Sequence, residues 1–371
     1  MRVKLKILHV VGAMNMGGTE TMLMNVFRSL DREKVQFDFI SFTNQDAYYD
    51  EEIRNLGGRI IYVSKSTSVF ELKRVIQEFG RYDVVHSHTL FNCGIANLAA
   101  KLAGVPIRIA HAHTTLDSSD GFIRKIYINL MQKLIKVTST HFLSCSQAAA
   151  TYLFGNKITK SSKYMYLPNM IDYASLMVPN QETIKQFKHE YQLENRFVIG
   201  HVGRLTKAKN HRFLIDLIEQ IKNVKKEALL LLVGDGQLRS ELELLVQEKQ
   251  LQQHVIFAGL QTDVSNALYN MDVFVFPSIF EGLGLVLLEA QLCGLPCVVS
   301  EAIQPEADLG MNLMTTLQLN EGVNSWCDEI LEKVHTQEVD LMTKQKALFN
   351  KGYTNEQIIN RLVNIYQGGE V

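Results

Sequence analysis

The chain has 371 residues, of which 46% are hydrophobic and 21% are charged, and its formal net charge is −1. These values are those of an ordinary soluble globular protein with room for two domains. No apolar stretch reaches the ~18 residues that a membrane helix needs, and no signal-peptide cleavage site follows the short apolar run near the N-terminus. The five cysteines are scattered and odd in number, so we expect free thiols in a cytoplasmic protein.

The first half of the chain alternates short apolar runs with longer amphipathic stretches. Near-continuous apolar strands separated by helices are typical of a parallel sheet covered on both faces. The pattern therefore predicts a doubly wound, Rossmann-like α/β domain over residues 1–175. Its strands are expected at residues 6–12, 37–42, 59–63, 83–88, 107–113, 141–146 and 164–169.

A polar stretch, residues 170–183, is interpreted as a linker, and the same alternation then restarts. It predicts a second doubly wound domain over residues 176–354. In such folds the ligand binds at the carboxyl ends of the strands. The strands of this domain are expected at residues 197–203, 228–234, 254–259, 272–278 and 296–300.

A glycine-rich turn, GAMNMGGTE, lies between the first strand and its helix. It fails as a P-loop because Gly18 occupies the position of the phosphate-binding lysine, which disfavours an ATPase or kinase. It also lacks the G-x-G-x-x-G fingerprint of a nicotinamide-dependent oxidoreductase. Gly17 and Gly18 instead give a flexible turn whose amides can approach a phosphate.

Two strands of the first domain end in histidines. His111 and His113 close the strand at 107–113, and His88 closes the strand at 83–88, with Asn92 just beyond. No third metal ligand is evident in the sequence beside these two histidines, so a metal site is disfavoured. Position at a strand terminus makes His113 a candidate ligand-contacting residue.

A basic amphipathic helix is expected at residues 122–137. Its apolar face carries Tyr127 and Leu130, and its other face carries Arg124 and Lys133. Such a helix can lie on an anionic bilayer. It can equally pack its apolar face on a core, and both readings stay open.

The loop GRLTKAKN, residues 203–210, follows the first strand of the second domain. Arg204 and Lys209 at this strand end could neutralise a diphosphate. The sequence contains no Asp-x-Asp, so a bridging divalent metal lacks its usual carboxylates and we expect a metal-independent reaction without a cofactor.

The most informative stretch is FPSIFEGLGLVLLEAQLCGLPCVVS, residues 276–300. A Gly-Leu-Gly turn precedes an apolar helix whose first amides, at Gly284, Leu285 and Val286, can hold an anion. Glu281 and Glu289 flank that anion site. Carboxylates beside a phosphate more plausibly accept hydrogen bonds from neutral hydroxyls, which suits a nucleotide sugar.

This stretch resembles the E-x7-E signature of retaining GT-B glycosyltransferases of family four. The G-G-x-E element at 17–20 and the G-R-x4-K element at 203–209 match the same family. Within that family, the sequence most resembles the bacterial exopolysaccharide and capsule transferases. The resemblance implies two Rossmann-like domains that face each other across a cleft, with the terminal helix, about 355–371, packed back onto the first. The usual E-G-F-G reads Glu281-Gly-Leu-Gly here, a mild departure at the sugar pocket.

The resemblance also implies a reaction and its residues. We expect transfer, with retention, from a UDP-linked sugar to a glycan or polyprenyl-diphosphate-linked acceptor, with no nucleic acid partner and with contact to the inner face of the plasma membrane left open. Catalytic roles fall to His113, Arg204, Lys209 and Glu281, and acceptor-side roles to His88 and Asn92. Donor contacts fall to Gly17, Gly18, Gly203, Gly234, Gly259, Leu260, Gln261, Gly284, Leu285, Val286 and Glu289.

Two alternatives share this fold. A nucleotide-sugar 2-epimerase needs the same donor groups but no acceptor. A non-catalytic nucleotide-sugar-binding protein would bind the donor without turning it over. The presence of Glu281, Glu289, Arg204 and Lys209 together argues against a non-catalytic protein, and product analysis without an acceptor would separate the transferase from the epimerase.

Overall fold

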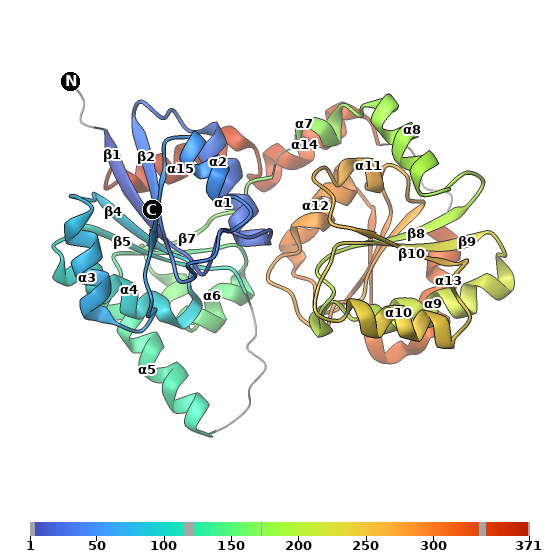
Figure 1. Ribbon diagram of the computed structural model, residues 1–371, viewed down its shortest axis with the longest axis horizontal. Helices are drawn as coiled ribbons and strands as arrows, with labels where there is room; N and C mark the ends of the chain where they lie inside the picture. The colour runs from blue at the N-terminus through green and yellow to red at the C-terminus, as the bar shows by residue number, and fades with distance from the viewer. Residues whose placement is uncertain (1–3, 115–121, 172, 334–338, 370–371) are drawn as a thin grey trace. The chain divides into compact units, whose positions relative to one another are not determined.

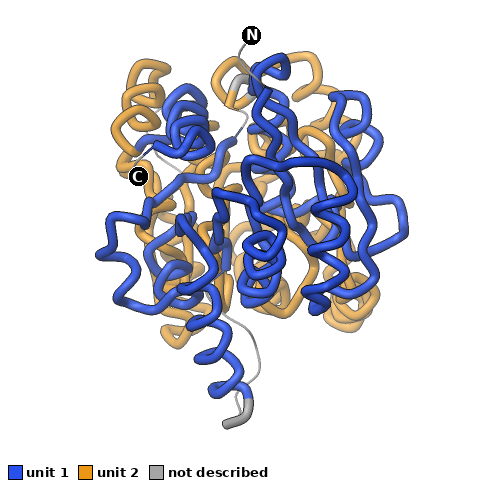
Figure 2. Tube along the Cα trace, turned by 90° about the vertical axis from the view of Figure 1, so that its left-hand side faces the viewer, with its two compact units in different colours: residues 1–171, 352–371 blue, residues 172–351 orange. Residues whose placement is uncertain are grey.

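The computed structural model describes residues 4–114, 122–171, 173–333 and 339–369. The chain divides into two compact units, which Figure 2 colours separately. Unit 1 comprises residues 1–171 and 352–371, and unit 2 comprises residues 172–351. Each unit is an α/β fold around a parallel sheet, so the predicted fold class is confirmed.

Unit 1 holds a sheet of seven strands in the order β3-β2-β1-β4-β5-β6-β7, and every pairing in it is parallel. The central strands are buried along most of their length, as a sheet covered on both faces requires. The strands are β1 Leu5–Val10, β2 Val35–Ser41, β3 Arg59–Tyr62, β4 Val84–Ser87, β5 Ile107–Ala112, β6 His141–Ser144 and β7 Tyr164–Tyr166.

The helices of unit 1 connect these strands and cover the sheet. They are α1 Gly18–Ser29, α2 Asp50–Asn55, α3 Val69–Glu78, α4 Cys93–Leu102, α5 Phe122–Thr138, α6 Gln147–Phe154 and α15 Asn355–Tyr366. The last of them contacts α1, and Figure 1 shows α15 in red beside α1 in blue. Its buried residues Ile358, Leu362 and Tyr366 belong to the same apolar cluster as Phe37. The C-terminal helix is therefore part of the core of unit 1.

Unit 2 holds a sheet of six strands in the order β10-β9-β8-β11-β12-β13, again all parallel. The strands are β8 Phe197–Val202, β9 Ala228–Val233, β10 Val255–Gly259, β11 Val273–Phe276, β12 Cys297–Ser300 and β13 Met314–Leu317. Every residue of β9 is buried, which explains its unbroken apolar sequence. Strand β13, an edge strand with two threonines, was not among the predicted strands.

The helices of unit 2 are α7 Ala174–Met177, α8 Gln181–Glu190, α9 His211–Val224, α10 Arg239–Glu248, α11 Ser265–Leu268, α12 Leu285–Leu292, α13 Gly322–Glu332 and α14 Leu341–Lys351. The linker interpretation of residues 170–183 thus covers α7 and the start of α8. Trp326, the single tryptophan of the sequence, is fully buried in the core of this unit. No helix in the described ranges is both long and apolar enough to cross a bilayer.

Candidate functional site

The clearest polar arrangement in unit 2 joins Lys209 to Glu281. Lys209 ends a short 3-10 turn, Lys207–Lys209, after β8, and its Nζ forms an ion pair and a hydrogen bond with Oε2 of Glu281 after β11. Both side chains are only 18% exposed, and Nζ lies 4.3 Å from the centroid of the Phe276 ring. A cation held over an aromatic face and beside a carboxylate has a fixed position. The structure therefore brings together two of the residues that the sequence singled out.

Backbone contacts fix the loops that carry this pair. The amide of Ile279 donates to the carbonyl of Ala208 at 2.8 Å, which fastens the segment after β11 to the 3-10 turn after β8. Asn210 follows that turn in the left-handed conformation with φ of 57°, a conformation that asparagine tolerates better than most residues. Arg204, in the same loop, is exposed, and its guanidinium has no ion pair with any residue in the described part of the chain. It is therefore accessible to an anionic ligand.

Helix α12 begins directly beside the pair. Gly284 precedes it with φ of 80°, and a Cβ at this position would lie 3.3 Å from the Phe276 ring, so glycine suits both the turn and the packing. Oε1 of Glu281 accepts from the amide of Gly282 at 3.2 Å, which directs its carboxylate along the turn. Leu285 and Val286 occupy the first turn of α12, where backbone amides lack a partner within the helix. Glu289, one turn on, is partly exposed.

Three glycines allow the neighbouring loops to pack backbone against backbone. The amide of Gly203 donates to the Val233 carbonyl at 2.9 Å, and the amide of Gly234 donates to the Gly259 carbonyl at 2.7 Å. A Cβ on Gly234 would lie 2.2 Å from the Gly203 oxygen, a distance that real Cβ atoms do not show. The carboxyl ends of β8, β9 and β10 are thus held in one layer, which is where a doubly wound fold binds its ligand.

The two candidates beyond β10, Leu260 and Gln261, differ in availability. Leu260 is exposed. The side-chain amide of Gln261 donates to the Tyr191 hydroxyl at 3.1 Å and to the Ala258 carbonyl at 2.8 Å. Both amide hydrogens of Gln261 therefore serve to hold this loop.

Two buried histidines lie behind Lys209 and were not singled out from the sequence. His201 donates from Nδ1 to the Val275 carbonyl at 2.9 Å, and its ring is 4.7 Å from that of His211. Burial, followed by the charge of Lys209, lowers the pKa of His211 to about 4, and burial also lowers the pKa of His201. Both rings are neutral at pH 7, so the positive charge here belongs to Lys209.

In unit 1 the glycine turn forms the start of α1. Gly17 precedes the helix in an extended conformation, and Gly18 is its first residue. A Cβ on Gly17 would lie 2.5 Å from Oε2 of Glu20, so the Glu20 carboxylate folds back over the start of the helix.

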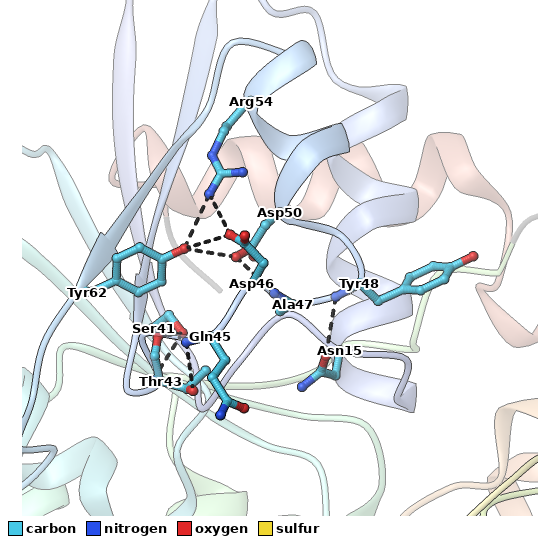
Figure 3. Close-up of polar contacts among 10 residues, drawn as sticks. All are labelled: Asn15, Ser41, Thr43, Gln45, Asp46, Ala47, Tyr48, Asp50, Arg54 and Tyr62. Atoms are coloured by element: carbon cyan, nitrogen blue, oxygen red, sulfur yellow. Dashed lines mark hydrogen bonds and ion pairs between the residues drawn. The ribbon is translucent and has the colours of Figure 1, made fainter.

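A polar network holds the loop after β2, at the carboxyl edge of the sheet in unit 1. The Tyr62 hydroxyl donates to the buried carboxylate of Asp50 at 3.2 Å and accepts from the Arg54 guanidinium, also at 3.2 Å. The amide of Tyr48 donates to Oδ1 of Asn15 at 3.2 Å, which ties this loop to the loop after β1 (Figure 3). These partners come from α2, from the end of β3 and from the loops after β1 and β2, so local sequence does not predict the network.

The structure brings the two predicted histidines of unit 1 together. Nδ1 of His88 lies 2.9 Å from Nε2 of His113, and Nε2 of His88 lies 3.1 Å from Nδ1 of His9. Burial lowers the pKa of His113 and of His9 to about 3, so both rings are neutral at pH 7. Asn92 lies nearby in sequence, but its amide is engaged by Ser66 at 3.4 Å and its oxygen by the Tyr127 hydroxyl at 3.5 Å.

A second pair of histidines lies beside the first. Nε2 of His86 is 3.1 Å from Nδ1 of His111, and Nδ1 of His86 is 2.9 Å from the hydroxyl of Tyr366 on α15. The sequence argument against a metal was that His111 and His113 lack a third ligand. The fold places His88 as a possible third ligand, because nitrogens of His88, His111 and His113 all lie within 4.8 Å of one another.

Comparison with known proteins identifies the family. Residues 16–175 match the family described as "Glycosyltransferase Family 4", and residues 182–310 match "Glycosyl transferases group 1". The chain is 37% identical to the Bacillus subtilis protein EpsF, named as a glycosyltransferase, over 97% of this chain and 96% of that one. It is 30% identical to the capsular polysaccharide biosynthesis glycosyltransferase CapH of Staphylococcus aureus, over 77% of this chain and 78% of the relative.

Solved structures share the fold. The crystal structure of HepE from Anabaena in complex with UDP and glucose superposes with a TM-score of 0.80 at 19% identity, covering 98% of this chain and 100% of that one. The lipopolysaccharide glycosyltransferase WaaG superposes with a TM-score of 0.73 at 14% identity, covering 98% and 100%. The fold is therefore GT-B, and the chain belongs to the family-four, group-1 glycosyltransferases of polysaccharide biosynthesis.

Proposed function

We propose that this chain is a retaining, metal-independent glycosyltransferase that transfers a sugar from a UDP-linked donor. The acceptor is a glycan or a polyprenyl-diphosphate-linked saccharide of the cell surface. The observation that carries the proposal is the Lys209–Glu281 pair at the start of α12. It places a cation for phosphate and a carboxylate for sugar hydroxyls within contact of each other.

Relatives support the choice of donor and acceptor. HepE has been crystallised in complex with UDP-glucose. An Escherichia coli relative, 27% identical over 80% of this chain, is named a UDP-Gal:α-D-GlcNAc-diphosphoundecaprenol α-1,3-galactosyltransferase. A UDP-linked sugar and a lipid-diphosphate-linked acceptor are therefore the substrates with which to test this protein.

The leaving diphosphate determines the role of the unit 2 cations. Its negative charge grows as the sugar bond breaks, so groups already aimed at it lower the barrier. Lys209, the exposed Arg204 and the first amides of α12 supply that charge compensation. The departing phosphate oxygen then accepts the proton of the incoming hydroxyl on the same face of the sugar, which retains the anomeric configuration.

Neutral hydroxyls of the donor are held by the carboxylates. Glu281 accepts hydrogen bonds from the transferred sugar, and Glu289 accepts them from the ribose. On unit 1, His113 contacts the donor sugar as a neutral imidazole, consistent with the lowering of its pKa to about 3. His88 and Asn92 serve the acceptor side.

Metal independence rests on the ligands that unit 2 offers. Within the described residues of unit 2, no group of three histidine, cysteine or carboxylate side chains converges closely enough to hold an ion. The sequence also lacks Asp-x-Asp. Fixed cations and helix amides replace the bridging ion in this proposal.

Product analysis with and without an acceptor tests the reaction. Incubation with a panel of UDP-, GDP- and ADP-sugars plus a lipid-linked acceptor is expected to give a new glycoside from a UDP-sugar. Its anomeric configuration, read by NMR, should match that of the donor, and the rate should persist in EDTA. An epimerised donor formed without acceptor, an inverted product or loss of activity in EDTA would contradict the corresponding part of the proposal.

The expected apolar face of α5 is only partly covered, which bears on membrane contact. Met131 is buried, whereas Ile126 and Leu130 are 54% and 59% exposed, next to the exposed Lys125 and Lys133. Exposed apolar side chains flanked by lysines suit an anionic membrane surface. We propose that α5 lies on such a surface. Sedimentation with vesicles of phosphatidylglycerol, but not phosphatidylcholine alone, is expected, and Ile126→Ser with Leu130→Ser should abolish it.

A further inference from the structure

Unit 1 contains more clustered histidines than the proposed function uses. His86 lies on β4 with His88 just beyond it, and His111 lies on β5 with His113 just beyond it. Strands β4 and β5 are adjacent in the sheet. Residues two apart on a strand point to the same face, so two neighbouring strands deliver four imidazoles to one side of the sheet.

We propose that His88, His111 and His113 form a binding site for a divalent transition metal of the zinc class. Nitrogens of these three residues lie within 4.8 Å of one another. Bonds of about 2.0–2.1 Å to a tetrahedral zinc ion place imidazole nitrogens about 3.3 Å apart. Nδ1 of His88 and Nε2 of His113 are 2.9 Å apart, so a shift of a few tenths of an ångström admits the ion.

The surroundings of His111 leave one nitrogen ready to ligate. Its Nε2 is buried and has no hydrogen-bond partner among the described residues. Its Nδ1 lies 3.1 Å from His86, whose other nitrogen is 2.9 Å from the Tyr366 hydroxyl. Metal-bound histidines are typically oriented by such a hydrogen bond at the opposite nitrogen. The His111–His86–Tyr366 chain supplies that support.

A second histidine set, His9, His86 and His88, also meets the distance criterion but fits less well. Both nitrogens of His86 are already engaged, by His111 and Tyr366. That set also contains two buried histidines, His9 and His86, whereas the set of His88, His111 and His113 contains one. The latter set also leaves a fourth coordination position for water or another small ligand.

The ion has no role in the transfer reaction proposed above. The groups that compensate the diphosphate belong to unit 2, and the three histidines belong to unit 1. A bound ion would instead occupy His113 and so compete with its contact to the donor sugar. This last consequence rests on the proposed function, but metal binding itself does not.

Cobalt titration of the full-length protein, without a histidine tag and after dialysis against chelator, tests the site. One Co²⁺ per chain should bind with visible absorption of tetrahedral intensity, and Zn²⁺ should displace it. His113→Gln and His111→Gln should each weaken the affinity at least 100-fold. Because His113 is partly exposed, its variant reports on the site even where the buried His111→Gln fails to fold.

Two further variants, at histidines outside the proposed ligand set, serve as controls. His141→Gln, on β6 of the same unit but outside the cluster, should bind cobalt as the wild type does. His9→Gln removes the partner of Nε2 of His88 but no ligand, so it should weaken binding less than His113→Gln does. Wild-type affinity in His113→Gln, a greater loss of affinity in His9→Gln than in His113→Gln, or the absence of stoichiometric binding would overturn the proposal. The assay contains no donor sugar, so its outcome is separate from that of the transfer assay. A reversible inhibition of transfer by zinc would link the two.

Discussion

Lys209 and Glu281 are 72 residues apart in sequence, yet their charged ends meet between the loops after β8 and β11. Strands β8 and β11 are neighbours in the sheet, so their carboxyl ends bring the two loops together. Without ligand, each side chain neutralises the other. When a donor binds, Lys209 would turn partly toward the diphosphate and Glu281 partly toward the sugar hydroxyls. The pair thus holds both groups in position before the donor binds.

Replacement of Lys209 by alanine tests whether its charge acts on the departing diphosphate. Loss of one preorganised donor of this kind costs about 10²- to 10³-fold in kcat. We expect Lys209→Ala to fall in that range in a steady-state transfer assay. Lys207→Ala is the matched control, because this exposed lysine lies in the same 3-10 turn, and it should change the rate less than twofold. Equal effects of the two substitutions would show that net charge alone matters.

Substitutions of Glu289 and of Glu281 should change different kinetic parameters. Glu289→Ala removes a contact that is made equally to bound donor and transition state, so it should raise the KM for the donor about tenfold with little change in kcat. Glu281→Ala should lower kcat, because it also releases Lys209. Glu248→Ala, an exposed glutamate at the end of α10, serves as the control. A change confined to kcat in Glu289→Ala would remove the ribose assignment.

Gly234 is expected to be indispensable to the layer of loops in unit 2. Alanine there would meet the Gly203 oxygen at 2.2 Å with φ of 126°, so we expect a loss of about 3 kcal/mol or more in the free energy of unfolding. Gly310→Ala should cost only about 1 kcal/mol, since its φ of 75° is strained but nothing lies within 4 Å. Urea unfolding followed by Trp326 fluorescence reports on this unit. Similar losses in both variants would refute the backbone clash.

Apolar patterning predicted most of the fold from the sequence. The run at 228–234 became β9, Ala228–Val233, which is buried throughout, and its neighbours followed the same rule. Strand β13 was not predicted, because an edge strand needs no continuous apolar run and Thr315 and Thr316 interrupt the apolar sequence here. Burial on both faces leaves a sequence signal, and an edge position does not.

The candidate site was predictable only in part. The glycine turn before α12, with Glu281 and Glu289, follows from local sequence because a turn and a helix start are local events. The ion pair of Lys209 with Glu281 and the convergence of His88 with His111 depend on strand order and register. Alternation along the chain predicts that strands exist but not which of them are neighbours.

Acid should destabilise unit 2 through His211. Its pKa falls from 6.5 to about 4 on folding, so between those values the unfolded chain binds more protons. The contribution is therefore complete above pH 6.5 and is lost as the pH falls toward 4, by at most about 1.4 kcal/mol per pH unit. His211→Gln should flatten the pH dependence of urea unfolding, read by Trp326 fluorescence. His189→Gln, whose side chain is 91% exposed, should leave the slope of the wild type, and an unchanged slope in His211→Gln would contradict the assignment.

The bond between Tyr366 and His86 should anchor the C-terminal helix in unit 1. The Tyr366 hydroxyl is buried and lies 2.9 Å from Nδ1 of a fully buried imidazole, so Tyr366→Phe leaves that nitrogen without its partner. The expected cost is about 1–3 kcal/mol, visible as faster amide hydrogen exchange in α15 and β4. Tyr48→Phe is the control, because this ring is 51% exposed and should give exchange rates equal to those of the wild type. Unchanged protection of α15 in Tyr366→Phe would show that apolar packing against Phe37 alone holds the helix, since that contact survives the substitution.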